Sequence, residues 1–501
     1  MKKILLSISL LLLLFFNITP QQDLSLYYMD NLQQVEQVNP ARRPKFRVNI
    51  GIPGLSSIYI NHFNTVFTPK DLFKNSKSVI KVPTNGKLPE LRKQHLKRMW
   101  TNRNYIGVHL KEDLIHFGFV LRENYVNFSI TENVSARVTL PGDLLEFPIR
   151  VTENPAQFDG KTQNFRGLNF HLNHYREYGI GISHPINKNI TIGGKIKYLY
   201  GMENIHTSKN TLRAKYDTNS KTINSQGEIK INSSGISDFN NGSATDYLFK
   251  KKNRGIGLDL GIENNINKKT TISLSVTDLG FIRWKNGNKN LIAKNGNISD
   301  KIVDVSEDFF SNPTYNQDSV DNSINELSND LSGEGLYEYN SKNYTTFLIT
   351  QLYFGGLRKL YKTDKFSGKA SALLHAEVYK WRVRPSLTLA YYQTVGKWLQ
   401  INVSYSYINR DLKNIGAGFT AKVGPFQYYL IIDNLMPLKR AKIQFGNEGK
   451  PTQYPKFSKT IHLKTGINLV FRKRKLGGRF FKNAKGNPTK LKKDKYNCPI
   501  M

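Results

Sequence analysis

The chain has 501 residues and carries 73 Lys and Arg against 38 Asp and Glu, which gives a formal net charge of +35. Its mean hydropathy of −0.47 excludes a bundle of membrane-spanning helices, but not a membrane β-barrel, in which only every second strand residue faces lipid. Because Lys and Arg are scattered along the chain, with one cluster at the C-terminus, we expect no nucleic-acid partner. The single cysteine, Cys498, excludes an internal disulfide framework.

The first twenty residues have the pattern of a cleaved secretory signal. Lys2 and Lys3 precede an apolar run over 4–16, and this run is too short to span a bilayer comfortably. We therefore expect residues 1–20 to be removed on export and a segment over 21–45 to begin the mature chain. No later apolar run approaches 18 residues, so the sequence predicts no spanning helix.

Alternation of apolar with polar residues dominates the region 46–471. In the stretch 178–200, Ile180 and Ile196 belong to apolar series that alternate with glycine, serine, threonine and lysine, and a short turn separates the two arms. Side chains on a strand point to opposite faces with period two, so this stretch predicts an antiparallel hairpin. The pattern recurs over 256–277, where the turn INKKTTI (266–272) nearly repeats INKNITI (186–192). Further alternating runs cover 382–391, 399–407, 415–421, 426–432 and 459–471.

Several connections are long and polar. We predict long loops near 201–253, with a strand extension around 211–217, and near 286–343, where helical spacing over 320–331 indicates a short helix. Helical segments are also expected over 88–99 and 141–147. The segment 472–501 holds eleven basic residues against one acid, Asp494, and we expect it to be a disordered tail.

Two architectures fit alternating strands: a sheet packed on a core, as in a secreted β-sandwich, and a barrel in lipid. The strands number about 14 and many span roughly 9–13 residues, which suits a tilted membrane strand. Their polar faces are rich in Gly, Ser, Thr and Asn, as a confined lumen requires. Tyr198, Trp284 and Tyr405 near strand ends are expected in aromatic belts. We therefore predict an all-β transmembrane antiparallel β-barrel over 46–471, with short helices in its loops.

Five stretches resemble a Bacteroidota outer-membrane family, domain-of-unknown-function family 5723. They are QQDLSLYYMD (21–30), the Asn39-Pro40-Ala41 step, RVNIGIPGLSSIYIN (47–61), HYREYGIGISHPI (174–186) and IKYLYGMENI (196–205). More distantly, the Asn39-Pro40-Ala41 step is similar to FadL-type fatty-acid channels and to the PorV-type barrels of type IX secretion. The resemblance implies the outer membrane of a Gram-negative bacterium and contact with its lipid. The FadL similarity implies that 21–45 forms a luminal hatch; the alternative is a periplasmic strap before the first strand.

No catalytic constellation is present. The sequence contains neither HExxH nor GxSxG, and its only cysteine lies in the tail. His171 and His174 point to opposite faces of an extended strand, so we do not expect them to share a metal. We predict a protein that is not an enzyme and uses no cofactor.

Six cations fall on the polar faces by alternation: Lys195, Lys197, Arg382, Arg384, Lys422 and Lys464. A charge facing mid-depth lipid costs several kcal/mol, so these side chains must face inward or lie near the rims. One hypothesis is a basic lumen that favours anionic solutes or fatty-acid carboxylates. The alternative is that the cations pair with luminal acids such as Asp259 and Glu263 and hold a plugged interior together.

Two functions stay open at this point. The first is passive transport of a small hydrophobic or anionic solute in a FadL-like manner. The second is a non-transporting interaction barrel that docks secretion or surface-protein machinery through its long loops, in the manner of PorV.

Overall fold

A computed structural model describes residues 24–66, 79–82, 104–153, 159–217, 219, 222–236, 253–293, 296–298, 337–379, 382–408, 411–433, 440–445, 452–455 and 460–473. The expected signal over 1–20, the helices expected over 88–99 and 320–331, and the tail beyond Lys473 lie outside these residues.

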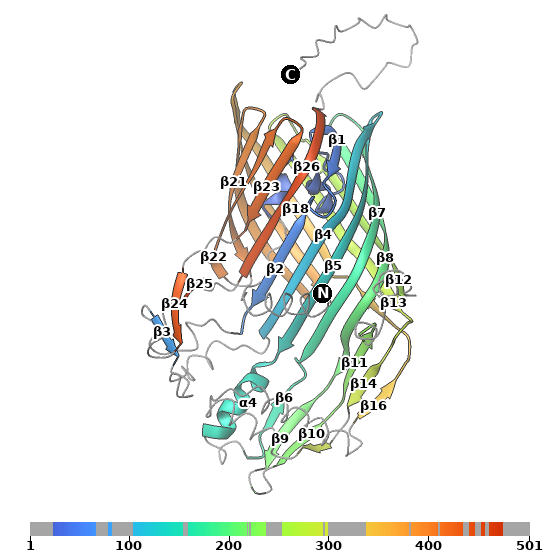
Figure 1. The fold of residues 1–501 in the computed structure, drawn as a ribbon, viewed down its shortest axis with the longest axis vertical. Coiled ribbons are helices and arrows are strands. Elements are labelled where there is room, and N and C mark those ends of the chain that lie inside the picture. The colour runs from blue at the N-terminus through green and yellow to red at the C-terminus, as the bar shows by residue number, and fades with distance from the viewer. Residues whose placement is uncertain are drawn as a thin grey trace, which may run out of the picture.

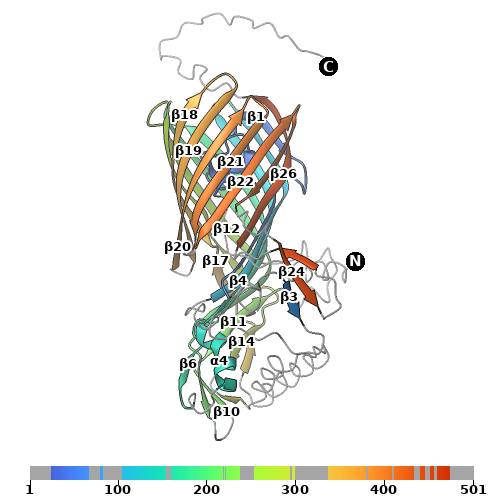
Figure 2. The ribbon, with the colours of Figure 1, turned by 90° about the vertical axis from the view of Figure 1, so that its left-hand side faces the viewer.

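Fourteen antiparallel strands close into a barrel (Figures 1 and 2). The first strand has two parts, β1 (Phe46–Gly51) and β2 (Ile58–Asn64), and each part pairs with both β4 and β26, which closes the sheet. The remaining strands follow one another in chain order: β4 (Asn104–Leu121), β5 (Asn124–Leu140), β7 (Asn169–Pro185), β8 (Ile190–Asn210), β12 (Asn253–Asn264), β13 (Thr270–Trp284), β17 (Tyr344–Phe347) with β18 (Thr350–Lys362), β19 (Phe366–Tyr379), β20 (Arg382–Val395), β21 (Leu399–Ile408), β22 (Asp411–Val423), β23 (Phe426–Ile432) and β26 (Thr460–Lys473). The predicted all-β barrel of about 14 strands is confirmed.

The two ends of the barrel differ. At one end, which we call the turn end, the hairpins β4–β5, β7–β8, β12–β13, β18–β19, β20–β21 and β22–β23 turn within a few residues. β1 begins and β26 finishes at this same end (Figure 1). The opposite end, which we call the loop end, bears all the long connections, together with two short ones, between β19 and β20 and between β21 and β22.

Alternation divides each strand between two environments. On β8 the side chain of Ile196 is 67% exposed on the outer face, whereas those of Lys195 and Lys197 are buried inside. An apolar exterior around a polar interior is the arrangement that a barrel requires in lipid. Among the described residues, no helix is long and apolar enough to cross a bilayer.

Trp284 departs from its expected place in an aromatic belt. Thr277 and Asp278 are both buried, and Asp278 has a φ of 58°. This β-bulge reverses which residues of β13 face inward, so Trp284 points into the barrel beside Leu199. Tyr198 and Tyr405 are exposed on the outer face, as expected.

At the loop end, strands continue beyond the barrel (Figure 1). β8 runs for 21 residues and pairs with β11 (Ile229–Ser234), so part of the loop predicted from 201 is strand. Phe147 of α4 (Gly142–Glu153) packs on Phe165 beside a small sheet. The further strands here are β6 (Thr162–Asn164), β9 (Arg213–Asp217), β10 (Thr222–Gln226), β14 (Asn290–Ala293), β15 (Gly296–Ile298) and β16 (Tyr337–Asn340), with β3 (Val79–Val82), β24 (Arg440–Phe445) and β25 (Thr452–Pro455) in a separate sheet.

Candidate functional site

Residues 24–43 lie inside the barrel near its turn end, and we call them the plug segment (Figure 1). The segment contains two short 3-10 helices, η1 (Leu26–Tyr28) and η2 (Gln33–Gln37). Its apolar side chains are almost completely buried against wall residues such as Tyr353, Tyr392 and Tyr429. The plug segment therefore forms a small apolar core with the inner face of the wall.

Hydrogen bonds fix the polar side of the plug segment to the wall. The Gln33 and Gln34 amides both donate to the Asn468 side chain, at 2.8 and 3.1 Å. Tyr27 donates to Ser273 at 3.1 Å. Since wall partners come from strands on different sides of the lumen, the segment is held all round rather than along one edge.

An ion-pair network holds the end of the segment that leads into β1. Arg42 pairs with Asp30 of the plug segment and, at 2.7 Å, with Glu263 of β12. Asp30 pairs in turn with Lys369 of β19. Burial raises the pKa of the Asp30 carboxyl, but Lys369, Arg42 and Lys45 lower it by more, so this pKa lies well below its ordinary value. The plug segment is thus bound most firmly while Asp30 is ionised.

The Asn39-Pro40-Ala41 step rests against two glycines of the wall. A Cβ on Gly193 of β8 would collide with the Pro40 backbone, and one on Gly261 of β12 would collide with the Asn39 side chain. The Asn39 amide donates to the Tyr27 hydroxyl at 2.9 Å. The sequence identified the step but not the two glycines that receive it, although both stand on the polar faces of the two similar hairpins.

A buried histidine forms another contact with the plug segment. His116 of β4 lies 2.8 Å from Glu36 and 3.3 Å from Asp113 of the wall. Gln37 donates to Asp113 at 2.7 Å and accepts from Lys464 at 2.9 Å. Of this group, only Lys464 was predicted from the sequence, because no local motif connects the other residues.

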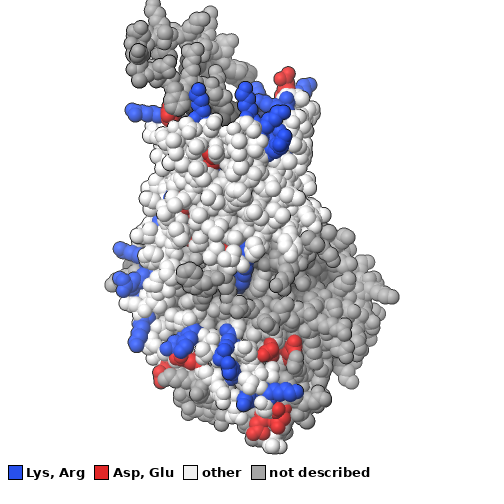
Figure 3. All heavy atoms as spheres, turned by 180° about the vertical axis from the view of Figure 1, so that it is seen from behind, with Lys and Arg blue, Asp and Glu red and all other residues white. Residues whose placement is uncertain are grey.

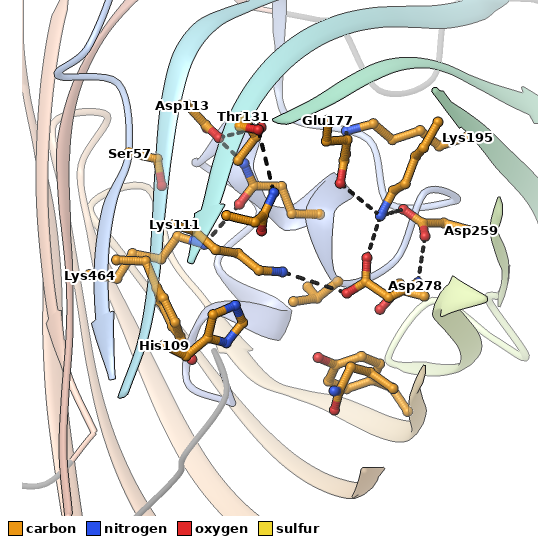
Figure 4. A pocket seen from close by; sticks show the side chains of 18 residues that line it. Ser57, His109, Lys111, Asp113, Thr131, Glu177, Lys195, Asp259, Asp278 and Lys464 are labelled. Atoms are coloured by element: carbon orange, nitrogen blue, oxygen red, sulfur yellow. Dashed lines mark hydrogen bonds and ion pairs between the residues drawn. The ribbon is translucent and has the colours of Figure 1, made fainter. Parts of the chain in front are cut away.

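On the loop-end side of the plug segment lies a polar cavity of about 40 Å³. Figure 4 shows charged side chains from several strands pointing into it. Lys197 is 2.6 Å from Asp278, 2.8 Å from Asp259 and 3.4 Å from Glu177. Lys195 also pairs with Glu177 at 3.4 Å, and Lys111 pairs with Asp278 at 3.5 Å. Ammonium and carboxylate groups therefore neutralise one another within the cavity.

The six cations singled out in the sequence separate into groups. Lys195, Lys197 and Lys464 line this cavity together. Arg384 lies farther toward the loop end, where it pairs with Glu377 at 3.3 Å. The Lys422 ammonium lies 5.7 Å from the Phe46 ring centre near the turn end. Arg382 belongs to β20, but its side chain is outside the described part of the structure.

The two acids expected to pair with these cations have different partners. Asp259 pairs with Lys197, whereas Glu263 pairs with Arg42 of the plug segment. The alternating patterns did not reveal Glu177 and Asp278, because each lies one residue outside a predicted hairpin, 178–200 or 256–277. The bulge at Asp278 turns its side chain inward. The alternating patterns did not reveal Lys111 either, which lies midway along β4.

Two further cavities continue toward the loop end. One of about 40 Å³ shares Lys111 and Asp278 with the first, and one of about 200 Å³ shares Arg137 with the second. The described lining of this last cavity, which we call the mouth, contains four cations and no carboxylate: Arg137, Arg166, Lys209 and Arg384. Among the described residues, no group of three or more His, Cys, Asp or Glu side chains is placed to hold a metal ion.

Several solved structures resemble this chain over most of its length. The toluene transporter TodX of P. putida is 10% identical, with a TM-score of 0.39, over 87% of this chain and 93% of that one. A FadL homologue of Pseudomonas aeruginosa is 10% identical, with a TM-score of 0.37, over 87% and 93% of the two chains. The translocator domain of the autotransporter NalP from Neisseria meningitidis is 8% identical, with a TM-score of 0.32, over 88% and 94%.

No curated protein matches the chain. The sequence profile of DUF5723, a family of unknown function, matches residues 40–433, in agreement with the resemblance seen in the sequence. The chain belongs to the DUF5723 family.

Proposed function

We propose that this protein is a non-enzymatic barrel of the outer membrane of a Gram-negative bacterium. In this proposal it admits small anionic solutes passively from the loop end, and the plug segment closes the route at the turn end. The observation that carries the proposal is the row of three cavities between the mouth and the plug segment, in which each cavity shares lining residues with its neighbour.

The location is supported by the asymmetry of the barrel. Bacterial outer-membrane barrels have short turns on the periplasmic side and longer loops outside. Here both ends of the closed sheet and six tight hairpins share the turn end, and every long connection between barrel strands lies at the loop end. We therefore assign the turn end to the periplasm and the loop end to the exterior.

The charge of the mouth supports an anionic solute. Four cations line that cavity, and among the described residues two carboxylates pair with them from outside its lining: Glu377 with Arg137 and Arg384, and Glu228 with Lys209. A lining with an excess of one charge raises the local concentration of the opposite ion. The central cavity is less suitable for an apolar solute. Such a solute would displace water from the ionised groups of the central cavity without replacing their hydrogen bonds, which is unfavourable.

Conductance across planar bilayers tests this proposal. The variant Asp30→Asn, which removes the charge that Arg42 and Lys369 share, is expected to loosen the plug segment and to raise the conductance over that of the unaltered protein. Its reversal potential in a KCl gradient should show preference for chloride. Replacing two exposed mouth cations, as in Arg166→Gln/Lys209→Gln, should reduce that preference.

The matched control is Lys161→Gln/Lys215→Gln, which removes the same charge from exposed positions outside the lining of the three cavities. It should leave selectivity unchanged. Absence of conductance from Asp30→Asn, or a preference for potassium, would refute the proposal.

Docking is the second candidate, and the folded extension at the loop end favours it. There α4 and the sheet β15-β10-β9-β6 stand beyond the barrel wall (Figure 2). Mild detergent extraction followed by mass measurement tests this function. Docking would be favoured over transport by a stoichiometric protein partner that still binds the Asp30→Asn variant but no longer binds when the extension is altered.

A further inference from the structure

Four neighbouring hairpins at the turn end carry an unbalanced charge. Their tips, at 185–190, 264–270, 358–366 and 395–398, contain eight exposed cations against a single carboxylate, Asp364. We call these cations the rim cluster; they are Lys188, Lys268, Lys269, Arg358, Lys359, Lys362, Lys365 and Lys397. Figure 3 shows Lys and Arg side chains gathered at this end, beyond a band of the barrel that is largely uncharged.

Backbone hydrogen bonds join each of these tips to the next. Asn265 donates to the Asn189 carbonyl at 2.9 Å, and Lys359 donates to the Lys269 carbonyl at 2.8 Å. Gly396 donates to the Lys365 carbonyl at 2.6 Å. The cations of the rim cluster are therefore carried on a continuous backbone, which fixes their spacing in spite of their mutual repulsion.

The repeated turn sequence has a structural explanation at this rim. In INKNITI the Asn187 side chain accepts from the amides of residues 189 and 190, at 2.8 Å each. Asn267 does the same in INKKTTI, with amides at 2.9 and 2.8 Å. Both turns thus present an isoleucine, Ile186 or Ile266, that is 52% exposed, next to the lysines of the rim cluster.

Exposed apolar side chains accompany the cations on each of the four hairpins. Besides the two isoleucines they are Leu360, Phe366 and Trp398, all about half exposed. Trp at a membrane–water interface places its ring at the level of the headgroups. Apolar anchors beside cations are the combination that a phospholipid headgroup region accommodates, since the acyl chains receive the first and the phosphates the second.

We propose that the rim cluster binds the headgroups of anionic glycerophospholipids in the leaflet that the turn end meets. The ammonium and guanidinium groups contact headgroup phosphates, while Ile186, Ile266 and Trp398 insert beside the acyl chains. Eight cations with one carboxylate repel one another in water, and bound phosphates relieve that repulsion. A soluble anion would relieve the repulsion as well, but it would leave the apolar side chains in water.

Lipid association measured by electron paramagnetic resonance tests this proposal on the full chain. The protein is reconstituted in phosphatidylcholine vesicles that contain a trace of spin-labelled phosphatidylglycerol or, in parallel, of spin-labelled phosphatidylcholine. The motionally restricted fraction gives the relative affinity of each lipid. The unaltered protein should prefer phosphatidylglycerol by about fivefold, the effect of one engaged lysine near a membrane surface, and the preference should fall as salt is added.

The variant Lys268→Gln/Lys269→Gln/Lys362→Gln should lower that preference to less than about twofold. Its matched control, Lys161→Gln/Arg213→Gln/Lys215→Gln, removes three exposed cations at the far end of the molecule and should retain the full preference. Both variants keep the basic segment 472–501, so the difference between them reports the rim cluster alone.

A second rim variant, Lys188→Gln/Lys397→Gln, provides an independent test in case the first variant misfolds. Heat-modifiable mobility on gels verifies that each barrel is folded. Equal association of the two lipids with the unaltered protein would overturn the proposal. So would a folded rim variant whose preference equals that of the control.

Discussion

The lumen and the rim cluster contain the same types of cation, Lys and Arg, but those of the lumen are buried and paired whereas those of the rim are exposed. In the central cavity Lys197 is buried and lies within ion-pair distance of three carboxylates. On the rim, eight exposed cations share one carboxylate. The difference follows from desolvation: a buried charge requires a partner within the protein, whereas an exposed charge has water and mobile ions. The lumen should therefore be sensitive to single substitutions and the rim tolerant of them.

The largest effect is expected where a buried partner is lost. Lys197→Met leaves Asp259, Asp278 and Glu177 close together with one cation fewer, and breaking a buried pair in this way costs about 3–5 kcal/mol. The free energy of unfolding, measured by denaturant titration in detergent, should fall by that order. Removing a facing charge as well, in Lys197→Met/Asp278→Asn, should restore part of the loss. A stable Lys197→Met barrel would show that water enters this cavity freely and that the contrast with the rim is false.

A smaller loss is expected where the plug segment touches the wall. Gly193→Ala places a methyl group against the Pro40 backbone, and overpacking of this kind costs roughly 1–3 kcal/mol. Limited proteolysis should then cleave the plug segment faster. The control is the neighbouring Gly194→Ala, whose new methyl group would have its nearest neighbour at 3.8 Å. Equal cleavage rates in the two variants would mean that the Asn39-Pro40-Ala41 step does not secure the segment.

Acid should loosen the plug segment through Asp30. Its pKa is held below the ordinary value inside the barrel, whereas in a released segment it returns to about 3.9. The stabilisation is therefore fully present above about pH 4 and is lost as the pH falls further toward the pKa of the bound state. Conductance of the unaltered protein should rise over this range. Asp30→Asn should lack the Asp30-dependent part of that rise, and an identical rise in both proteins would assign the effect to other groups.

The smallest effect on stability belongs to the rim cluster. Single replacements such as Lys362→Gln should change the free energy of unfolding by less than about 0.5 kcal/mol, because the side chain is exposed. Thermal unfolding followed by heat-modifiable mobility measures this. A loss as large as that of Lys197→Met would show that the rim, too, depends on internal pairing.

The sequence by itself determined the architecture of the wall. Strand geometry makes every second residue face the same side, so the alternation around Ile180 and Ile196 was enough to separate an apolar face from a polar one. The same rule placed Lys195, Lys197 and Lys464 on the polar face. It also predicted the antiparallel hairpins, because their turns are short and local.

Only the tertiary structure decided what the polar faces do. Arg42 meets Glu263 across 221 residues of chain, and Gln33 meets Asn468 across 435, distances over which no local pattern carries information. A single extra residue at Asp278 exchanged the inward and outward positions of the following residues of β13, so that Trp284 faces inward. A strict two-residue period cannot predict this, because it assumes that no residue is inserted by a bulge. Alternation fixes the face of a side chain, but its partner depends on closure of the barrel around the plug segment.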